Sequence, residues 1–257
     1  MTSKKIIIIA SLLAIIPLAE NIFPKRFNTY NSNIVFSSQR YQDSKLLNIA
    51  KSSTVRIEGA VSGTGVLVDK RNNLYTIITA WHVIKDNLPG EELGIITADG
   101  KEHLWNTKFL QRLGSTDMAL LKFKTTRKYK ILDIGDPKNT KYKDQIYIAG
   151  FPLNNSKKIT LSKGTVIAIA EVNIDQGYQM LYSNKTEPGM SGGMILNTKG
   201  ELIGIHGRGE LNQRKSSNGQ KIFKTGINQG MSIIFYKKFI NKKPIDTFNN
   251  NSVTADD

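Results

Sequence analysis

Short runs of apolar and β-branched residues dominate the chain from residue 46 onward. They are rich in valine, isoleucine, threonine and tyrosine and are bounded by glycine, proline, asparagine or aspartate. Many short runs with turn residues at fairly regular spacing are typical of an antiparallel sandwich or barrel. The runs interpreted as strands are residues 54–59, 63–69, 74–84, 93–100, 118–123, 144–152, 163–172, 192–200, 201–207 and 224–235. The pattern therefore predicts an all-β fold.

A basic segment, residues 124–140, divides this region into two halves of similar length. Each half holds enough runs for about six strands, so we expect two barrels, one over about 44–135 and one over about 141–236. The dipeptide at 199–200, Lys-Gly, predicts a hairpin turn. Residues 233–243 have the pattern of a short amphipathic helix.

The N-terminus has a different pattern. Two lysines precede an apolar run over residues 6–16. This run is too short to span a bilayer but is typical of a secretory signal peptide, with cleavage after Ala19. Pro17 makes the cleavage site imperfect, so an uncleaved membrane anchor through residues 6–19 is the alternative. We expect a periplasmic or secreted protein.

The remaining segments outside the strands are polar. Residues 20–43 contain isolated aromatics without a sustained period and are interpreted as a leader or linker. Residues 246–257 are expected to be a disordered tail. The folded domain is therefore predicted over residues 44–245.

Composition excludes some chemistry. Cysteine is absent from the 257 residues, so the chain offers no disulfide, zinc–thiolate site or thiol nucleophile. The formal net charge of +15 is compatible with nucleic acid, an anionic surface or acidic substrates. We find no nucleic-acid recognition motif, and interpret the lysine-rich runs at 122–130 and 138–143 as solvated loops. We expect no metal, no cofactor and no specific nucleic-acid partner, and a monomer.

One serine lies among glycines in "TEPGMSGGMILN", residues 186–197. Ser191 is flanked by Gly189, Gly192 and Gly193, which permit a tight turn. Such a turn can aim the backbone N–H groups of Gly189 and Ser191 at one point, as an oxyanion hole requires. The alternative is a glycine-rich hairpin with an incidental serine.

A serine nucleophile needs a base and an orienting acid. The histidines are His82 in "TAWHVI", His103 in "GKEHLW" and His206 in "LIGIHGRG". His103 lies in what looks like an exposed strand and is taken as structural. Asp117 directly precedes an apolar strand, where an aspartate alone is usually a turn or cap residue.

The order of these residues separates two mechanistic classes. The letters "GMSGG" also match the nucleophile elbow G-x-S-x-G, which requires the order Ser, acid, His and a following helix. No aspartate lies between Ser191 and His206, and the segment after Ser191 has the pattern of a strand. The order His82, Asp117, Ser191 is instead that of chymotrypsin-type hydrolases.

The segments "TAWHVI", "STDMALLKF" and "EPGMSGGMILNTKGELIGIHG" resemble the three catalytic blocks of trypsin-like serine peptidases. The chain is most similar to the bacterial, disulfide-free branch with HtrA-like and V8-like glutamyl endopeptidases, over about residues 53–236. The resemblance implies two six-stranded antiparallel barrels with the site in the cleft between them. It implies Ser191 as nucleophile, His82 as general base and acid, Asp117 holding the His82 tautomer, and the amides of Gly189 and Ser191 as oxyanion hole.

The chain also departs from parts of the family pattern. Met190 stands where animal digestive members carry an aspartate that pairs with a new N-terminus, so we predict no zymogen switch of that type. About a dozen residues follow the last predicted element, so we expect no PDZ domain of the HtrA kind.

Three residues suggest a substrate preference. The "GIH" ending at His206 and the threonine five residues before the nucleophile, Thr186, resemble the V8-like enzymes. An imidazole N–H and a hydroxyl could bind a glutamate carboxylate, and Lys185, near the pocket floor by position, could add positive charge. We expect a preference for Glu or Asp at P1. The alternative is that His206 is a satisfied core histidine.

These observations predict an exported serine endopeptidase that works through an acyl-enzyme. The alternative from another class is a catalytically idle trypsin-like fold used as a binding module. A third hypothesis is an anion-binding surface protein that uses the basic loop.

Overall fold

The computed structural model describes residues 29–87, 93–105, 109–155, 158–172, 174–209 and 226–242, with the backbone alone over 29–39. The predicted signal peptide and tail lie outside these residues. The chain forms two units, Met1–Tyr41 and Gln42–Asp257, and both sheets belong to the second. Among the helices of the described ranges, none combines the length and the apolar character that a membrane span requires.

The first half of the strand-rich region forms one antiparallel sheet of seven strands in the order β5-β4-β1-β2-β3-β7-β6. The strands are β1 Thr54–Glu58, β2 Gly63–Arg71, β3 Leu74–Ala80, β4 Gly94–Ile96, β5 Glu102–Leu104, β6 Gln111–Arg112 and β7 Met118–Lys124. The sheet curls so that the ring of His103 on β5 lies 4.9 Å from the ring of Phe123 on β7.

This sheet differs from the six-stranded barrel that we expected. It is a curled half-barrel, because its edge strands β5 and β6 span only three and two residues. Within the described residues no backbone ladder joins these two edges. The sheet therefore stays open, and its own apolar side chains pack together as a core.

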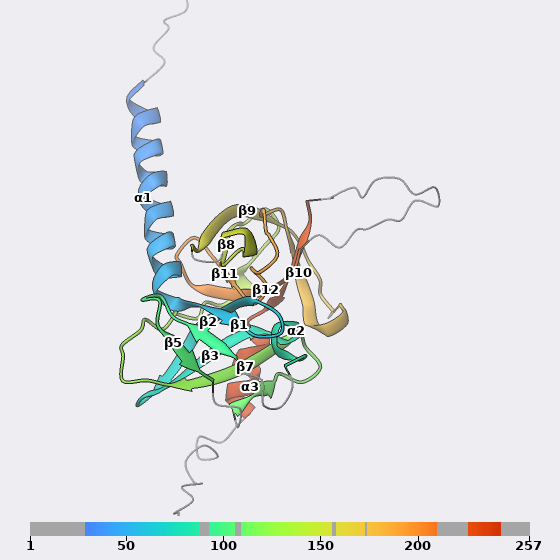
Figure 1. The fold of residues 1–257 in the computed structure, drawn as a ribbon. Helices are drawn as coiled ribbons and strands as arrows, with labels where there is room; N and C mark the ends of the chain where they lie inside the picture. The colour runs from blue at the N-terminus through green and yellow to red at the C-terminus, as the bar shows by residue number, and fades with distance from the viewer. Residues whose placement is uncertain are drawn as a thin grey trace, which may run out of the picture. The chain divides into compact units, whose positions relative to one another are not determined.

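The second half forms a closed antiparallel barrel of six strands in the order β10-β13-β12-β11-β8-β9, as predicted. The strands are β8 Gln145–Gly150, β9 Thr160–Ile169, β10 Tyr178–Tyr182, β11 Met194–Leu196, β12 Leu202–Arg208 and β13 Asn228–Ser232. Figure 1 shows β8, β9, β11 and β12 gathered in one group and β1, β2, β3 and β7 in the other. The predicted hairpin turn joins β11 to β12, and Gly200 supplies its positive φ of 87°.

In the part of the chain that the structure describes, the α-helices are α1 Thr29–Ser53, α2 Trp81–Ile84 and α3 Ile234–Lys242. Short 3-10 turns are η2 Pro137–Asn139, η3 Leu153–Asn155 and η4 Asp175–Gly177. The predicted amphipathic C-terminal helix is confirmed by α3. Helix α1 was not expected; from Gln42 on it belongs to the larger unit, where Leu46 and Ala50 are fully buried. The domain limits at residues 44 and 245 stay a prediction.

One apolar core joins the two sheets. It includes Val66 and Ile78 from the first sheet, Tyr147 and Met194 from the barrel, and Leu46 from α1. Each sheet also has a smaller core of its own. Because burial of apolar area is the main stabilising term in folding, the shared core fixes the two sheets against each other. The loops that leave the sheets at this interface can therefore form one site.

Candidate active site

The pairing of β3 with β7 brings His82 next to Asp117. The two strands run antiparallel with Ala80 opposite Met118, so the residues just after β3 face those just before β7. The backbone N–H of Trp81, the first residue of α2, donates to the Asp117 carbonyl at 3.0 Å. His82 therefore follows a strand that is buried from Tyr75 to Ala80, and it lies directly beside the predicted acid.

Asp117 holds His82 by two hydrogen bonds. The His82 backbone N–H donates to Asp117 Oδ1 at 2.8 Å, and His82 Nδ1 lies 2.6 Å from Asp117 Oδ2. Burial raises the pKa of Asp117, but hydrogen bonds and charge from His82 and a hydrogen bond from Tyr178 outweigh it and lower the pKa below its usual value. An ionised carboxylate only accepts, so Nδ1 carries the proton and Nε2 is left as a base.

Thr64 on β2 ties the serine turn to the first sheet. Its backbone N–H donates to the Ser191 carbonyl at 2.8 Å, and its hydroxyl donates to the Gly189 carbonyl at 2.8 Å. A Cβ added at Gly192, where φ is +84°, would lie 2.0 Å from the Thr64 carbonyl oxygen and 3.0 Å from the Ala80 nitrogen. The serine turn therefore lies against the end of β3, from which His82 follows.

The segment before Ser191 forms a tight turn. Pro188 and Gly189, with φ of +93° at the glycine, occupy the central positions, and Met190 N–H donates to Glu187 O at 3.1 Å. This is the pattern of a type II turn. The Leu153 N–H donates to the Pro188 carbonyl at 2.9 Å and so fixes the orientation of the Pro188–Gly189 peptide.

The predicted oxyanion donors are the amides of Gly189 and Ser191. Among the hydrogen bonds of the described residues, neither amide is a donor. Two N–H groups in one turn without a protein acceptor can serve an oxyanion. The Ser191 hydroxyl donates to the Gly207 carbonyl at 3.0 Å. A rotation about the Cα–Cβ bond of Ser191 would release its hydroxyl from that carbonyl.

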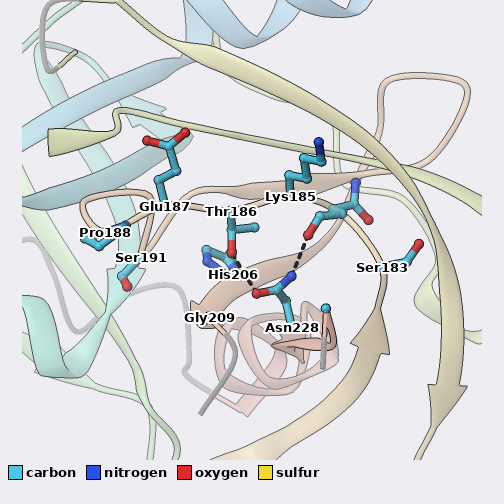
Figure 2. A pocket seen from close by; sticks show the side chains of 11 residues that line it. Ser183, Lys185, Thr186, Glu187, Pro188, Ser191, His206, Gly209 and Asn228 are labelled. Atoms are coloured by element: carbon cyan, nitrogen blue, oxygen red, sulfur yellow. Dashed lines mark hydrogen bonds between the residues drawn. The ribbon is translucent and has the colours of Figure 1, made fainter. Parts of the chain in front are cut away.

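A cavity of about 610 Å³ begins beside Ser191. Its lining residues are Ser183, Asn184, Lys185, Thr186, Glu187, Pro188, Ser191, His206, Gly209, Gly226 and Asn228. The Thr186 hydroxyl donates to Asn228 Oδ1 at 2.7 Å, and Figure 2 shows both side chains near His206. In the same view the exposed side chains of Lys185 and Glu187 extend away from this group. The structure thus brings Thr186 and His206 together, but not Lys185.

His206 is fully buried, and its Nδ1 lies 2.6 Å from the Tyr182 hydroxyl. Burial, and secondly the charge of His82, lower the pKa of His206 to about 3. A hydrogen bond with the Gln229 backbone acts in the opposite direction but is outweighed. Burial also raises the pKa of Tyr182, so its phenol keeps its proton. If the phenol donates to Nδ1, the neutral imidazole carries its proton on Nε2.

The third histidine, His103, lies on β5 of the first sheet and not in this site. Its Nε2 lies 3.0 Å from the Tyr129 hydroxyl, and its ring packs against Phe123. Within the described ranges, no three His, Asp or Glu side chains gather as metal ligands would.

Three residues of the site were missed by the sequence analysis: Thr64, Tyr178 and Asn228. Thr64 contacts residues about 125 positions away, which no local pattern reveals. Tyr178 lies in the alternating run "YQMLY", whose period-two pattern indicates a strand with inward tyrosines. A buried tyrosine hydroxyl needs a partner, and this was the available signal for Tyr178.

The fold and the paired His82–Asp117 beside a serine turn define the class of trypsin-like serine peptidases. The family model described as a trypsin-like peptidase domain matches residues 63–205, more than half of the chain. The chain therefore belongs to the family of trypsin-like peptidase domains.

The relatives include serine protease Do-like HtrA from Lactobacillus helveticus, 26% identical over 67% of this chain and 41% of the relative. Serine protease Do-like HtrA from Bacillus subtilis (strain 168) is 26% identical over 65% of this chain and 38% of its own length. Serine protease HtrA-like from Staphylococcus aureus (strain USA300) is 27% identical over 69% of this chain and 23% of its own length. The chain thus matches about two fifths of the first two relatives and about a quarter of the third.

Proposed function

We propose that this protein is an exported serine endopeptidase in which His82, Asp117 and Ser191 form the catalytic triad. The observation that carries the proposal is the 2.6 Å contact between His82 Nδ1 and the buried, ionised Asp117. That contact leaves the His82 Nε2 lone pair available. The attachment of the serine turn to the first sheet through Thr64 supports the same assignment.

The chemistry follows from these groups. Ser191 Oγ turns from the Gly207 carbonyl to His82 Nε2, gives up its proton and attacks the peptide carbonyl. The amides of Gly189 and Ser191 stabilise the oxyanion, and the Asp117 carboxylate stabilises the imidazolium. His82 then returns the proton to the leaving amine, and water hydrolyses the acyl-enzyme by the same steps.

For substrate choice, the proposal is a preference for Glu or Asp at P1. The cavity beside Ser191 offers His206 and Thr186, and a neutral His206 with its proton on Nε2 would donate to a carboxylate. In the structure the Thr186 hydroxyl donates its single proton to Asn228. It would have to turn away from Asn228 to donate to the substrate carboxylate. Lys185 also lines the cavity, but its exposed side chain extends away from Thr186 and His206, so we assign it no contact with the P1 carboxylate.

Profiling the cleavage of a peptide library tests this preference. We expect enrichment of Glu or Asp at P1 in the wild type and its loss in His206→Ala. Lys185→Ala is the matched control and is expected to keep the preference. Cleavage without acidic enrichment, or an unchanged preference in His206→Ala, would remove the P1 assignment while leaving the triad intact.

Export rests on the N-terminal sequence alone. If residues 1–19 are a signal peptide, the mature protein recovered outside the cytoplasm begins at Glu20. N-terminal sequencing of the protein from each cell fraction checks this. An intact N-terminus in the membrane fraction would favour the anchor, and one in the cytoplasm would contradict export.

A second candidate function is a catalytically idle binding module. The observation in its favour is the Ser191 hydroxyl, which is bound to the Gly207 carbonyl. An idle fold would have an intact cavity but would not react with an electrophile at Ser191.

A further inference from the structure

Tyr178 places a third donor on the catalytic acid. Its hydroxyl lies 2.5 Å from Asp117 Oδ2, the same oxygen that accepts from His82 Nδ1. With the His82 backbone N–H on Oδ1, three donors surround a carboxylate that is 1% exposed. Burial and the neighbouring carboxylate raise the pKa of Tyr178, so the phenol keeps its proton and is the donor in this pair.

The three partners come from different parts of the fold. His82 and Asp117 follow and precede strands of the first sheet, whereas Tyr178 is the first residue of β10 in the barrel that also carries Ser191. The Tyr178 hydrogen bond therefore links the acid–base pair directly to the barrel of the nucleophile. The Gln176 carbonyl, which accepts from the Asp117 N–H at 2.8 Å, makes a second link from the same segment.

The local packing is built around the Tyr178 ring. A Cβ added at Gly207 would lie 2.5 Å from both Cε1 and Oη of Tyr178, so the ring occupies the space that a side chain at position 207 would need. On Arg208 the guanidinium carbon lies 4.1 Å from the ring centroid, and one of its guanidinium nitrogens lies 3.7 Å from Asp175 Oδ2. The ring is thus held between Gly207 and Arg208, with its hydroxyl on Asp117.

We propose that Tyr178 is a positioning residue of the triad, which orients the Asp117 carboxylate toward His82 and keeps it ionised across the interface between the two sheets. This inference rests on the proposed peptidase function. Tyr178 acts through Asp117 and does not touch the reacting atoms. Its loss should therefore slow acylation of Ser191 without closing the substrate cavity.

The direction of the pH effect follows from charge. A donor on Asp117 disperses its negative charge, so removal of the donor raises the proton affinity of the coupled His82–Asp117 pair. The other charged groups near the ring are Arg208 and Asp175, which the test variant leaves in place. His206 is neutral and adds no charge above pH 4. The acid limb of the activity profile should therefore move to higher pH.

The test compares Tyr178→Phe with the wild type in the rate constant for labelling Ser191 by a fluorophosphonate, from pH 5 to 9. We expect a fall on the order of tenfold to hundredfold, the range for a lost hydrogen bond to a charged group. We also expect the acid limb to shift to higher pH. Tyr75→Phe is the matched control, because Tyr75 is a buried tyrosine on β3 of the first sheet with a hydrogen-bonded hydroxyl, and it should keep the wild-type profile.

A second variant separates positioning from folding. Replacing Tyr178 by 3-fluorotyrosine keeps the ring and makes the phenol a stronger donor, so the acid limb should move to lower pH, opposite to Tyr178→Phe. The proposal is overturned if Tyr178→Phe retains the wild-type rate and profile, or if fluorination leaves the acid limb unmoved. Absence of labelling in the wild type would instead overturn the triad itself.

Discussion

At the scale of single residues, the site depends on where two protons sit. Asp117 is buried and ionised, which keeps a proton on His82 Nδ1. His206 is buried and neutral, with the Tyr182 hydroxyl on its Nδ1. One imidazole is thus held as a base and the other as a neutral hydrogen-bonding group, and the difference arises from their neighbours.

Asp117→Asn should abolish most of the catalysis with little change in fold. An amide at this position can donate to His82 Nδ1 and would move the imidazole proton to Nε2, the wrong tautomer for a base. We expect kcat to fall by about 10⁴. Steady-state hydrolysis of a peptide substrate checks this, and a loss of less than tenfold would contradict the role of Asp117.

His206 should make the stability of the protein depend on pH. Its folded pKa of about 3 lies below the ordinary value of 6.5, so the unfolded chain binds a proton that the folded chain refuses. The free energy of unfolding should therefore fall as pH drops from about 6.5 toward 4, by on the order of a few kcal/mol. Denaturant titrations at several pH values measure this free energy of unfolding, and it should depend less on pH in His206→Gln than in the wild type. An equal dependence on pH in both proteins would contradict the buried, neutral state of His206.

The proposed catalytic residues could be selected from the sequence because three short motifs carry them in a diagnostic order. Thr64 and Tyr178 could not, because their roles arise from contacts across the two sheets. The direction of the Lys185 side chain also depends on the local backbone. Lys185 lines the cavity, as its position in the sequence suggests, but its side chain extends away from Thr186 and His206.

At the scale of elements, the serine turn depends on glycine for two different reasons. Gly189 supplies a positive φ of 93° in the turn that precedes Ser191 and holds the proposed oxyanion amides. Gly192 combines a positive φ with close approach to the Thr64 carbonyl on β2. The cluster of glycines around Ser191 therefore serves both a turn and a contact between sheets.

Gly192→Ala should destabilise the protein far more than the same substitution at a glycine that has a positive φ but no close neighbour. Its Cβ would lie 2.0 Å from backbone, whereas a Cβ at Gly100, with φ of +73°, would meet nothing within 4 Å. We expect Gly100→Ala to cost about 1–2 kcal/mol and Gly192→Ala at least about 2 kcal/mol more. Thermal unfolding of both variants checks this, and equal costs would argue against the close contact.

Most strands could be predicted because alternating or buried apolar runs between turn residues identify them. The half-barrel could not, since its two-residue strand β6 is defined by its pairing with β7 rather than by a pattern of its own. Over residues 40–53, where the side chains of helix α1 are described, the buried apolar positions are Leu46 and Ala50, too few to give a helical pattern in the sequence. The polar residues before them gave no helical period.

At the scale of the whole folded unit, the two sheets share one apolar core, in which Met118 from β7 and Met194 from β11 are both fully buried. A site assembled from both sheets requires that the two sheets keep a fixed position relative to each other. The shared core meets that requirement and makes the folded unit cooperative.

Met118→Ala should weaken both sheets together. Deleting a fully buried side chain costs about 2–5 kcal/mol because it leaves a cavity. Hydrogen exchange should show a similar loss of protection in β3 and in β12, with a single unfolding transition. Loss of protection confined to the first sheet would show that the two sheets unfold independently.

The most direct measurement of the central claim is covalent labelling of Ser191. The native protein is treated with a fluorophosphonate, and the modified residue is located by mass spectrometry of its peptides. We predict one label on Ser191, no label in Ser191→Ala and a labelling rate reduced by several orders of magnitude in His82→Ala. A native protein that stays unlabelled while its fold is intact would contradict the account and favour the idle binding module.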